Sequence, residues 1–275
     1  MSKNGSSSDG RDKQRRRVAR LLKPHAPPDW EERFRRDDLL DSVIDGRPIQ
    51  MFVMAADIRE STTLMKESIR FEQFALVMDK FVSSVRRGIR NSGGWFDKFT
   101  GDGFLAYWIV QEAEPERYEE RFVQTAGDVA HTAHLLTDLF HRRVLEDFRS
   151  NSRNLSGGVG LSMGLDGGPG YLVEIADELT VVGPPVVGAV RMVTAAALPR
   201  EIVANVYLGQ RLSAGQDNVY GALGVTVTRE RRPTKEYPRG QEVYALVFGG
   251  DDEQGAVERP GADGADDPDG PDGAG

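Results

Sequence analysis

Hydrophobic and polar residues alternate with two different periods in the first half of the chain, and the change of period marks the order of its elements. Residues Ile49–Asp57 form an apolar run of strand length that stops at a carboxylate. Apolar residues recur at helical spacing over Phe71–Ile89, and Asn91–Gly94 then end the helix. Two strand-like runs follow, Trp95–Thr100 and Phe104–Val110. The Gly-Asp-Gly sequence between them predicts a β-hairpin.

The second half of the chain continues the alternation of helices and strands. A long helical pattern covers Glu116–Phe148, and two strands are expected at Gly157–Gly168 and Tyr171–Val182. Residues Pro184–Leu198 predict a helix with proline at its entry. The remaining elements are a short helix and three short strands: Val206–Leu212, then Glu201–Ala204, Val219–Thr228 and Glu242–Phe248. The order predicts an α+β protein with a ferredoxin-like βαββαβ core and extra strands and helices.

Charge separates the two ends of the chain from its middle. Residues 1–23 contain eight Lys or Arg and two Asp, whereas residues 251–275 contain nine Asp or Glu and one Arg. Both ends have too few apolar residues to bury, so we expect residues 1–28 to be a disordered basic arm and 251–275 a disordered acidic tail. Residues 29–48 read as a helical lead-in and 49–250 as the folded domain.

Composition excludes several classes of protein. The chain has no cysteine, which removes disulfides and thiolate metal sites and favours a cytoplasmic location. No apolar run reaches the ~20 residues needed to cross a bilayer, so no integral membrane segment is expected. The basic arm by itself does not predict a nucleic-acid partner. Gly-x₄-Gly-Lys and dinucleotide-binding glycine motifs are absent.

Two distant carboxylates are predicted to meet at one edge of the sheet. In the βαββαβ order the first strand lies antiparallel to the third, so Asp57, at the end of the first strand, lies beside Asp102 in the turn of the hairpin. Two carboxylates would repel each other there unless cations lay between them, and oxygen ligands suit Mg²⁺ or Mn²⁺. The alternative is that Asp102 is only a turn-forming residue, because Asp-Gly is common in hairpins.

Four segments in order resemble the catalytic domains of class III nucleotidyl cyclases, the adenylate and guanylate cyclases. They are FVMAADIREST, KFTGDG, LTVVGPPVVGAVRM and PTKEYPRGQEVYAL. The resemblance implies two divalent ions per site, Mn²⁺ or Mg²⁺, bound by Asp57, Asp102 and the carbonyl of Ile58. It places Lys98 and Thr180 at the positions that recognise the base of a nucleoside triphosphate substrate.

The resemblance also implies catalytic residues and a partner. Arg191 matches the arginine that stabilises charge on the α-phosphate, and Lys235 matches the lysine that holds the β- and γ-phosphates. The family builds its sites at the interface of a head-to-tail homodimer. The family's transition-state asparagine falls on Val187, and its glycine after Asp-Ile-Arg falls on Glu60. These departures leave open a catalytically inactive domain, in which Arg191 and Lys235 are surface residues.

The base that this chain would cyclise is open at this stage. The chain is similar to the bacterial Pycsar cyclases in its compact stand-alone character and in the Asp-Ile-Arg-x-Ser-Thr and Thr-Gly-Asp-Gly segments. This similarity implies that the product is cyclic UMP or cyclic CMP, which acts on a separate antiphage effector. Phe52 on the first strand would shrink the base pocket towards a pyrimidine, unless it is an ordinary core residue. Lys98 favours an adenylate cyclase instead, although Thr180 does not enforce adenine.

Overall fold

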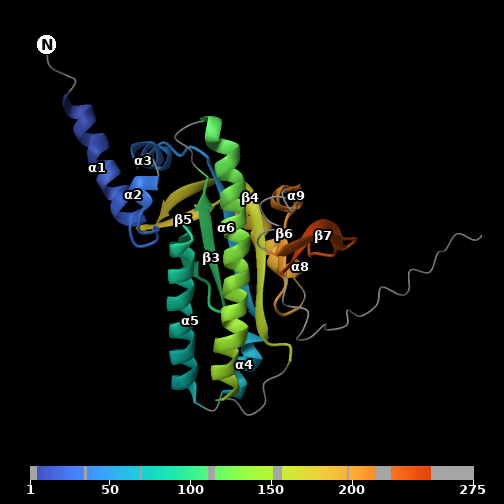
Figure 1. Cartoon of the computed structure of the whole chain (residues 1–275). Coiled ribbons are helices and arrows are strands. Elements are labelled where there is room, and N and C mark those ends of the chain that lie inside the picture. Colours follow the sequence, from blue (N-terminus) through green and yellow to red (C-terminus); the bar gives the residue numbers. More distant parts are fainter. Residues whose placement is uncertain are drawn as a thin grey trace, which may run out of the picture.

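One twisted sheet forms the centre of the protein, which we describe from a computed structural model covering residues 5–33, 36–68, 70–110, 115–150, 157–196, 198–214 and 224–248. The strand order is β2-β3-β1-β4-β6-β8-β7, with β5 paired to β4 outside this path (Figure 1). The strands are β1 Ile49–Arg59, β2 Trp95–Phe99, β3 Gly103–Ile109, β4 Gly160–Ile175, β5 Glu178–Val182, β6 Ile202–Ala204, β7 Val225–Arg232 and β8 Gln241–Phe248.

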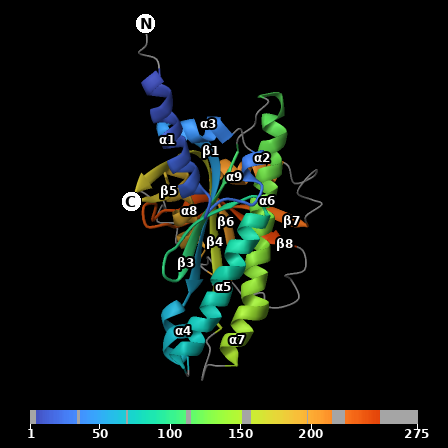
Figure 2. The same ribbon diagram turned by 90° about the vertical axis from the view of Figure 1, so that its left-hand side faces the viewer.

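Helices cover both faces of this sheet. They are α1 Gly5–Leu22, α2 Trp30–Arg33, α3 Arg36–Ile44, α4 Ser61–Glu67, α5 Phe71–Asn91, α6 Tyr118–Leu139, α7 Leu145–Arg149, α8 Pro184–Ala195 and α9 Val206–Ala214. A 3₁₀ turn, Pro115–Arg117, precedes α6, and a π-helical turn, Phe140–Val144, joins α6 to α7. Helices α5 and α6 lie side by side on one face (Figures 1 and 2). Within the described residues, no helix combines the length and the apolar character needed to cross a membrane.

Strand β1 divides the core into two layers because successive side chains of a strand point to opposite faces. Phe52, Met54 and Ala56 join the apolar cluster that contains α5, α6 and α9. Met51 and Val53 join the cluster on the other face, with residues of α1, α3 and α8. All five are buried, so β1 is a central strand covered on both sides. The α+β class and the expected neighbours of β1 are therefore confirmed.

The expected disorder of the N-terminal arm does not hold for residues 5–28. Helix α1 begins at Gly5, and its last turns bury Val18, Ala19 and Leu22. Arg15 forms a two-pronged ion pair with Asp41 of α3, with nitrogen–oxygen distances of 2.9 and 2.6 Å. The charge of this segment hid a narrow apolar stripe, which covers the sheet face that α8 leaves free. The acidic tail, 251–275, lies outside the described residues.

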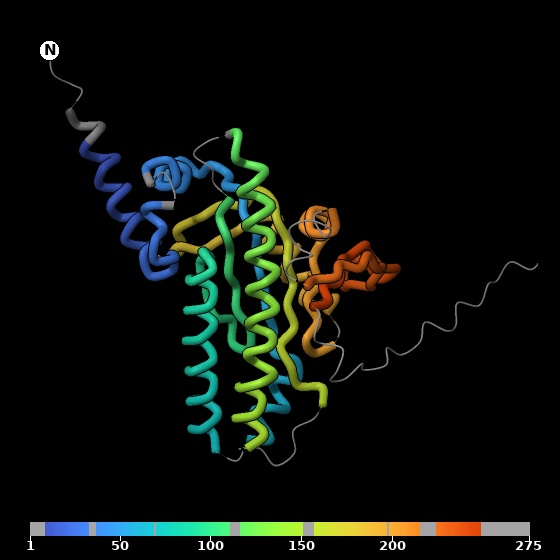
Figure 3. Tube along the Cα trace, in the orientation of Figure 1, coloured from blue at the N-terminus to red at the C-terminus, as the bar shows by residue number. Residues whose placement is uncertain are grey.

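The boundary between the two central strands of the second half also differs from the expected one. Strand β4 runs for 16 residues, straight through the glycines at which a break was expected. The chain turns instead at Ala176 and Asp177, whose φ angles of 52° and 64° suit a tight hairpin turn. The hairpin of β4 and β5 projects past the sheet towards α1 (Figure 3). Of the expected strand Val219–Thr228, residues 219–223 lie outside the described part, and β7 begins at Val225.

Candidate functional site

Strand pairing brings Asp57 and Asp102 to the same edge of the sheet. Asp57 lies opposite Gly103 in the antiparallel pairing of β1 with β3. The backbone N–H of Ile58 donates to the carbonyl of Asp102 over 2.9 Å, which fixes the hairpin turn against the end of β1. Gly103 has no room for a side chain, since a Cβ there would lie 2.1 Å from the Ala56 carbonyl oxygen. The convergence expected from topology is thus present in the structure.

The two carboxylates interact electrostatically. Burial raises the pKa of Asp57, and the charge of Asp102 raises it further, while Arg59 opposes both. The guanidinium of Arg59 lies 3.5 Å from the Asp57 carboxylate. The hydroxyl of Ser61 donates to the Asp102 carboxylate over 2.7 Å. Ser61 was not predicted as a site residue, and its place at the start of the helix after β1 is the only signal that could have pointed to it.

This pair of acids fits a divalent cation by the chemistry of its donors. Carboxylate and carbonyl oxygens are the ligands of Mg²⁺ and Mn²⁺, and Mg²⁺ keeps several waters or phosphate oxygens when proteins bind it. Among the residues that the structure describes, no group of three or more His, Asp or Glu side chains could hold a metal ion alone. Asp57 and Asp102 would therefore hold an ion together with the Ile58 carbonyl, water and a phosphate ligand.

Arg59 anchors this edge to helix α8. Its guanidinium donates to the carbonyls of Val193 and Ala196 at the C-terminal end of α8, the latter over 2.6 Å, and to the Ser162 hydroxyl over 3.2 Å. The last carbonyls of a helix lack partners within the helix, and a cation there also interacts favourably with the helix dipole. The position of Asp57 is consequently tied to that of α8.

Glu60, the residue after Arg59, adopts a left-handed conformation with φ 53°. Residues other than glycine rarely adopt this conformation, because their Cβ crowds the backbone. The requirement explains the glycine at this position in the resembled family. In this chain glutamate occupies the position and precedes the first residue of α4.

Lys98 and Thr180, which lie 82 positions apart, meet in a small polar network. The ammonium of Lys98 donates to the Thr180 hydroxyl over 2.7 Å. The Thr180 hydroxyl in turn donates to the carboxylate of Asp97 over 3.0 Å. The same carboxylate accepts the backbone N–H of Val181 over 3.2 Å and lies 3.4 Å from the Lys98 ammonium. The two residues expected to recognise a base are thus adjacent.

Asp97 is the member of this network that was not predicted. Its side chain is 1% exposed, against 49% for Lys98. Burial raises the pKa of Asp97, whereas Lys98, the Thr180 hydroxyl and the Val181 N–H each oppose that rise. A buried carboxylate without partners would be costly, so these donors are what allow it to remain at this position. The available signal was a carboxylate inside a short strand, directly before Lys98.

Arg191 lies close to the segment that contains Lys235. Its Nε is 3.4 Å from the carboxylate of Glu236, in the connection between β7 and β8. Lys235 is exposed beside it. Val187, at the family's asparagine position, is 50% exposed one turn earlier on α8. The structure therefore brings together the two segments that carry the predicted catalytic cations, with Lys235 exposed and Arg191 partly exposed.

Asp166 on β4 is a second buried acid that sequence reasoning missed. Its carboxylate accepts from the Asn205 amide over 3.0 Å and from the Gly167 N–H over 2.8 Å. Burial raises the pKa of Asp166 to about 6, although these two donors and the charge of Arg191 oppose the rise. A Cβ on Gly188 would lie 1.7 Å from this carboxylate, so α8 packs directly over it at a glycine.

The expectation that Phe52 lines a base pocket is wrong in this structure. Phe52 is 0% exposed, and its ring packs edge to face on Phe122 of α6 with centroids 4.8 Å apart. Its side chain points to the face of β1 opposite to that of Met51 and Val53. Phe52 is a core residue, the alternative left open by the sequence.

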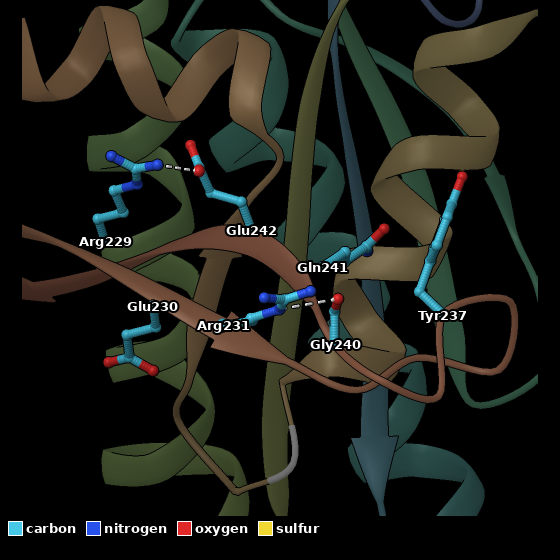
Figure 4. Close-up of a pocket in the computed structure, with 7 residues that line it drawn as sticks. All are labelled: Arg229, Glu230, Arg231, Tyr237, Gly240, Gln241 and Glu242. Atoms are coloured by element: carbon cyan, nitrogen blue, oxygen red, sulfur yellow. Dashed lines mark hydrogen bonds and ion pairs between the residues drawn. The ribbon is translucent and has the colours of Figure 1, made fainter.

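The hollow drawn in Figure 4 lies away from the predicted residues. It has a volume of about 570 Å³ and is lined by the ends of β7 and β8 and their connection, including Tyr237. Its walls are held by the ion pair of Arg229 with Glu242 and by Arg231, which donates to the Gly240 carbonyl over 3.2 Å. None of the predicted site residues lines it, and its charged groups already have partners.

The predicted residues therefore form three groups in one chain. The first is Asp57 with Asp102, the second Lys98 with Thr180, and the third Arg191 with the segment of Lys235. No hydrogen bond or ion pair between described residues links one group directly to another. Each group is accessible to a ligand in at least one of its members.

Comparison with known proteins places this arrangement in a known fold. No family model and no curated protein matches the chain. Among solved structures, the adenylyl cyclase CyaB from P. aeruginosa has a TM-score of 0.58 and 17% identity over 73% of this chain and 95% of that one. The guanylate cyclase domain of RhGC from Catenaria anguillulae, in complex with GTP, has a TM-score of 0.56 and 15% identity over 73% and 97%. The guanylyl cyclase Cya2 has a TM-score of 0.56 and 17% identity over 76% and 97%. The chain therefore has the fold of class III adenylyl and guanylyl cyclase catalytic domains.

Proposed function

We propose that this protein is a nucleotide cyclase, which converts a nucleoside triphosphate into a 3′,5′-cyclic nucleotide and pyrophosphate. The observation that carries the proposal is the meeting of Asp57 and Asp102 at one edge of a cyclase-like fold. The two acids raise the free energy of the empty site, because burial and mutual repulsion both disfavour the charged form of Asp57. Such an arrangement suits a site that binds cations with its substrate.

In the proposed reaction the 3′-oxygen of the ribose forms a bond to the α-phosphorus as the bond to the β-phosphate oxygen breaks. The hydroxyl proton is released and pyrophosphate leaves. Mn²⁺ or Mg²⁺, when bound, would supply charge neutralisation and a lowered pKa of the attacking hydroxyl. Arg191 would offer two parallel donors to charge on the α-phosphate, and Lys235 would hold the leaving pyrophosphate. Lys235 is exposed, and the Arg191 side chain is 34% exposed.

We further propose that two copies of the chain share their sites. Among the residues that the structure describes, no hydrogen bond or ion pair links the aspartate pair to the Lys98–Thr180 pair, and a substrate must contact both pairs for its base to be recognised during the reaction. Helix α8 leaves two apolar residues next to Arg191 uncovered, Val187 at 50% and Val190 at 52% exposure. A partner copy seated on that surface would bury them and bring the separate groups around one substrate.

A pyrimidine substrate, with cyclic UMP or cyclic CMP acting on a separate effector in antiphage defence, is the finer proposal. It now depends on the similarity of the sequence motifs to Pycsar cyclases, because Phe52 is a core residue. Adenylate cyclase activity is the second candidate, and Lys98 favours it, because its ammonium keeps one N–H for a ring nitrogen beside its contacts with Thr180 and Asp97. A catalytically inactive domain is the third, favoured by Val187, which has no hydrogen-bond donor for a ribose or phosphate.

The deciding experiment incubates the purified chain with ATP, GTP, CTP and UTP separately, with Mn²⁺, and separates the products by chromatography. We expect one cyclic nucleotide and an equal amount of pyrophosphate. Asp57→Ala should lose at least about 100-fold in kcat, since removal of a group that stabilises transition-state charge commonly costs that much. Asp79→Ala, an exposed acid of α5, is the matched control and should keep full activity. Full activity of Asp57→Ala would refute the role of the acids, and no product with any nucleotide would refute the cyclase proposal.

A further inference from the structure

The hydroxyl of Thr180 lies between two groups that fix the direction of its proton, the Asp97 carboxylate and the Lys98 ammonium. The argument starts from three groups with fixed polarity. A carboxylate can only accept hydrogen bonds, and an ammonium can only donate them. The Thr180 hydroxyl lies between the two, 3.0 Å from the Asp97 carboxylate and 2.7 Å from the Lys98 ammonium. Its single proton must therefore point to Asp97.

The charge on Asp97 is supported by its surroundings. Three donors converge on its two oxygens: the Val181 N–H at 3.2 Å on one, and the Thr180 hydroxyl and the Lys98 ammonium on the other. Burial raises the pKa of Asp97, and these three donors oppose that rise by stabilising the charged form. The side chain is 1% exposed, so water does not compete for these contacts.

The contacts within the network leave few hydrogen-bonding groups of Lys98 and Thr180 for a ligand. Of the three N–H groups of Lys98, one is directed to Thr180 and one towards Asp97, and the third is free. The Thr180 hydroxyl has used its proton and one lone pair, and one lone pair remains. The pair therefore presents one donor beside one acceptor, with the donor and acceptor atoms 2.7 Å apart.

We propose that Asp97 is a positioning residue for base selection. By fixing the direction of the Thr180 hydroxyl, it leaves a donor at Lys98 and an acceptor at Thr180, which match a nucleobase edge that carries an acceptor and a donor in that order. This inference rests on the proposed function. Cytosine and uracil carry opposite patterns at the same two atoms of the ring edge, and so do adenine and hypoxanthine. A site of fixed polarity accepts one member of each pair and meets two like groups in the other.

Asp97→Asn changes this polarity without changing the shape of the side chain. The Val181 N–H needs an acceptor, so the amide oxygen of the new side chain faces it and the amide NH₂ faces Thr180. The Thr180 hydroxyl then accepts from the amide, and its proton is free to point to the ligand. The site then presents two donors side by side. It no longer distinguishes cytosine from uracil, or adenine from hypoxanthine.

The test is a competition assay with the full-length chain and Mn²⁺, in which CTP and UTP, or ATP and ITP, are present in the same tube. The ratio of the two products gives the ratio of kcat/KM and does not depend on how much of a variant is correctly folded. For the wild type we expect a ratio of about tenfold or more within the preferred pair, the effect of one mismatched pair of hydrogen bonds. Asp97→Asn should bring the ratio to within about threefold of unity.

Two further variants separate positioning from a merely structural role. Thr180→Val removes the hydroxyl at nearly constant shape and should also lose the selectivity, whereas Thr180→Ser keeps the hydroxyl and should retain it. In the double variant Asp97→Asn/Thr180→Val, the ratio should equal that of Thr180→Val alone, because Lys98 is a donor in every variant and Asp97 sets the polarity of the pair through the Thr180 hydroxyl. Retained selectivity in Asp97→Asn, or a wild type that does not distinguish the members of either pair, would overturn the inference.

The failure of the cyclase proposal would give a different result. If the wild type forms no cyclic product, competition between the same nucleotides for binding is measured by displacement of a fluorescent nucleotide in the presence of Mn²⁺. Selective binding that Asp97→Asn abolishes would then support the inference for a binding protein. Unselective or absent binding would overturn it together with the cyclase proposal.

Discussion

Asp166 couples the stability of the fold to pH, and Asp166→Asn tests that coupling. Its pKa is about 6 in the folded protein against an ordinary value of 3.8, a difference of about two units, and the residue is 5% exposed. Since one unit corresponds to 1.36 kcal/mol, the charged form is disfavoured by about 3 kcal/mol. Between pH 4 and 6 the folded chain binds more protons here than the unfolded chain does, so this contribution to stability falls as pH rises.

The measurement is urea unfolding of wild type and Asp166→Asn at pH 4, 5, 6 and 7, followed by circular dichroism. Asparagine does not titrate, and the other acids contribute equally to both proteins. Because an ordinary Asp is already more than half ionised at pH 4, the unfolding free energy of the wild type minus that of the variant should fall by about 2 kcal/mol from pH 4 to pH 7. Asp79→Asn, which removes the charge of an exposed acid, is measured in parallel as the control. A flat difference for Asp166→Asn would refute the reasoning about burial.

Three other substitutions test the packing and the chemistry. Gly164→Ala should cost about 1–3 kcal/mol of unfolding free energy, because its Cβ would lie 2.1 Å from the Ala189 carbonyl oxygen of α8. Leu22→Ala should cost about 2–5 kcal/mol, since Leu22 is fully buried; a cost below about 0.5 kcal/mol would mean that α1 does not dock. Arg191→Ala should lower kcat about 100-fold and leave the thermal stabilisation by Mn²⁺ unchanged, and loss of both would contradict its assignment to the phosphate alone.

The central elements and the aspartate pair could be predicted from the sequence because they follow from local pattern and strand order. The sequence shows an apolar run that stops at Asp57, then a helix, then a hairpin with Asp102 in its turn. In the strand order that this pattern predicts, the two acids meet at one edge of the sheet. The adjacency of Lys98 and Thr180 could not be obtained in this way. It depends on the projection of the β4–β5 hairpin beside β2, and only the resemblance to a family suggested it.

The features that the sequence did not predict all depend on contacts between residues that lie far apart in the sequence. Asp97 and Asp166 sit in apolar runs, where a carboxylate reads as an interruption until its donors from β5 and from Asn205 are known. Helix α1 was read as a charged leader, although Leu22 and two neighbours complete the covering of one sheet face. The length of β4 was hidden by its glycines, one of which makes room for Phe52.

The hairpin of β4 and β5 is joined to the rest of the sheet through the pairing of β4 alone. Within the described residues β5 pairs with β4 alone and β2 with β3 alone, so the neighbouring edges of β2 and β5 are joined by the side chains of Asp97 and Lys98 rather than by a ladder of backbone hydrogen bonds. Arg17 of α1 contacts Glu174 and Asp177 near the tip of the same hairpin. A partner that pulled α1 away would therefore loosen the contacts between β2 and β5, where the proposed base site lies, and we expect it to alter the choice of substrate at a distance.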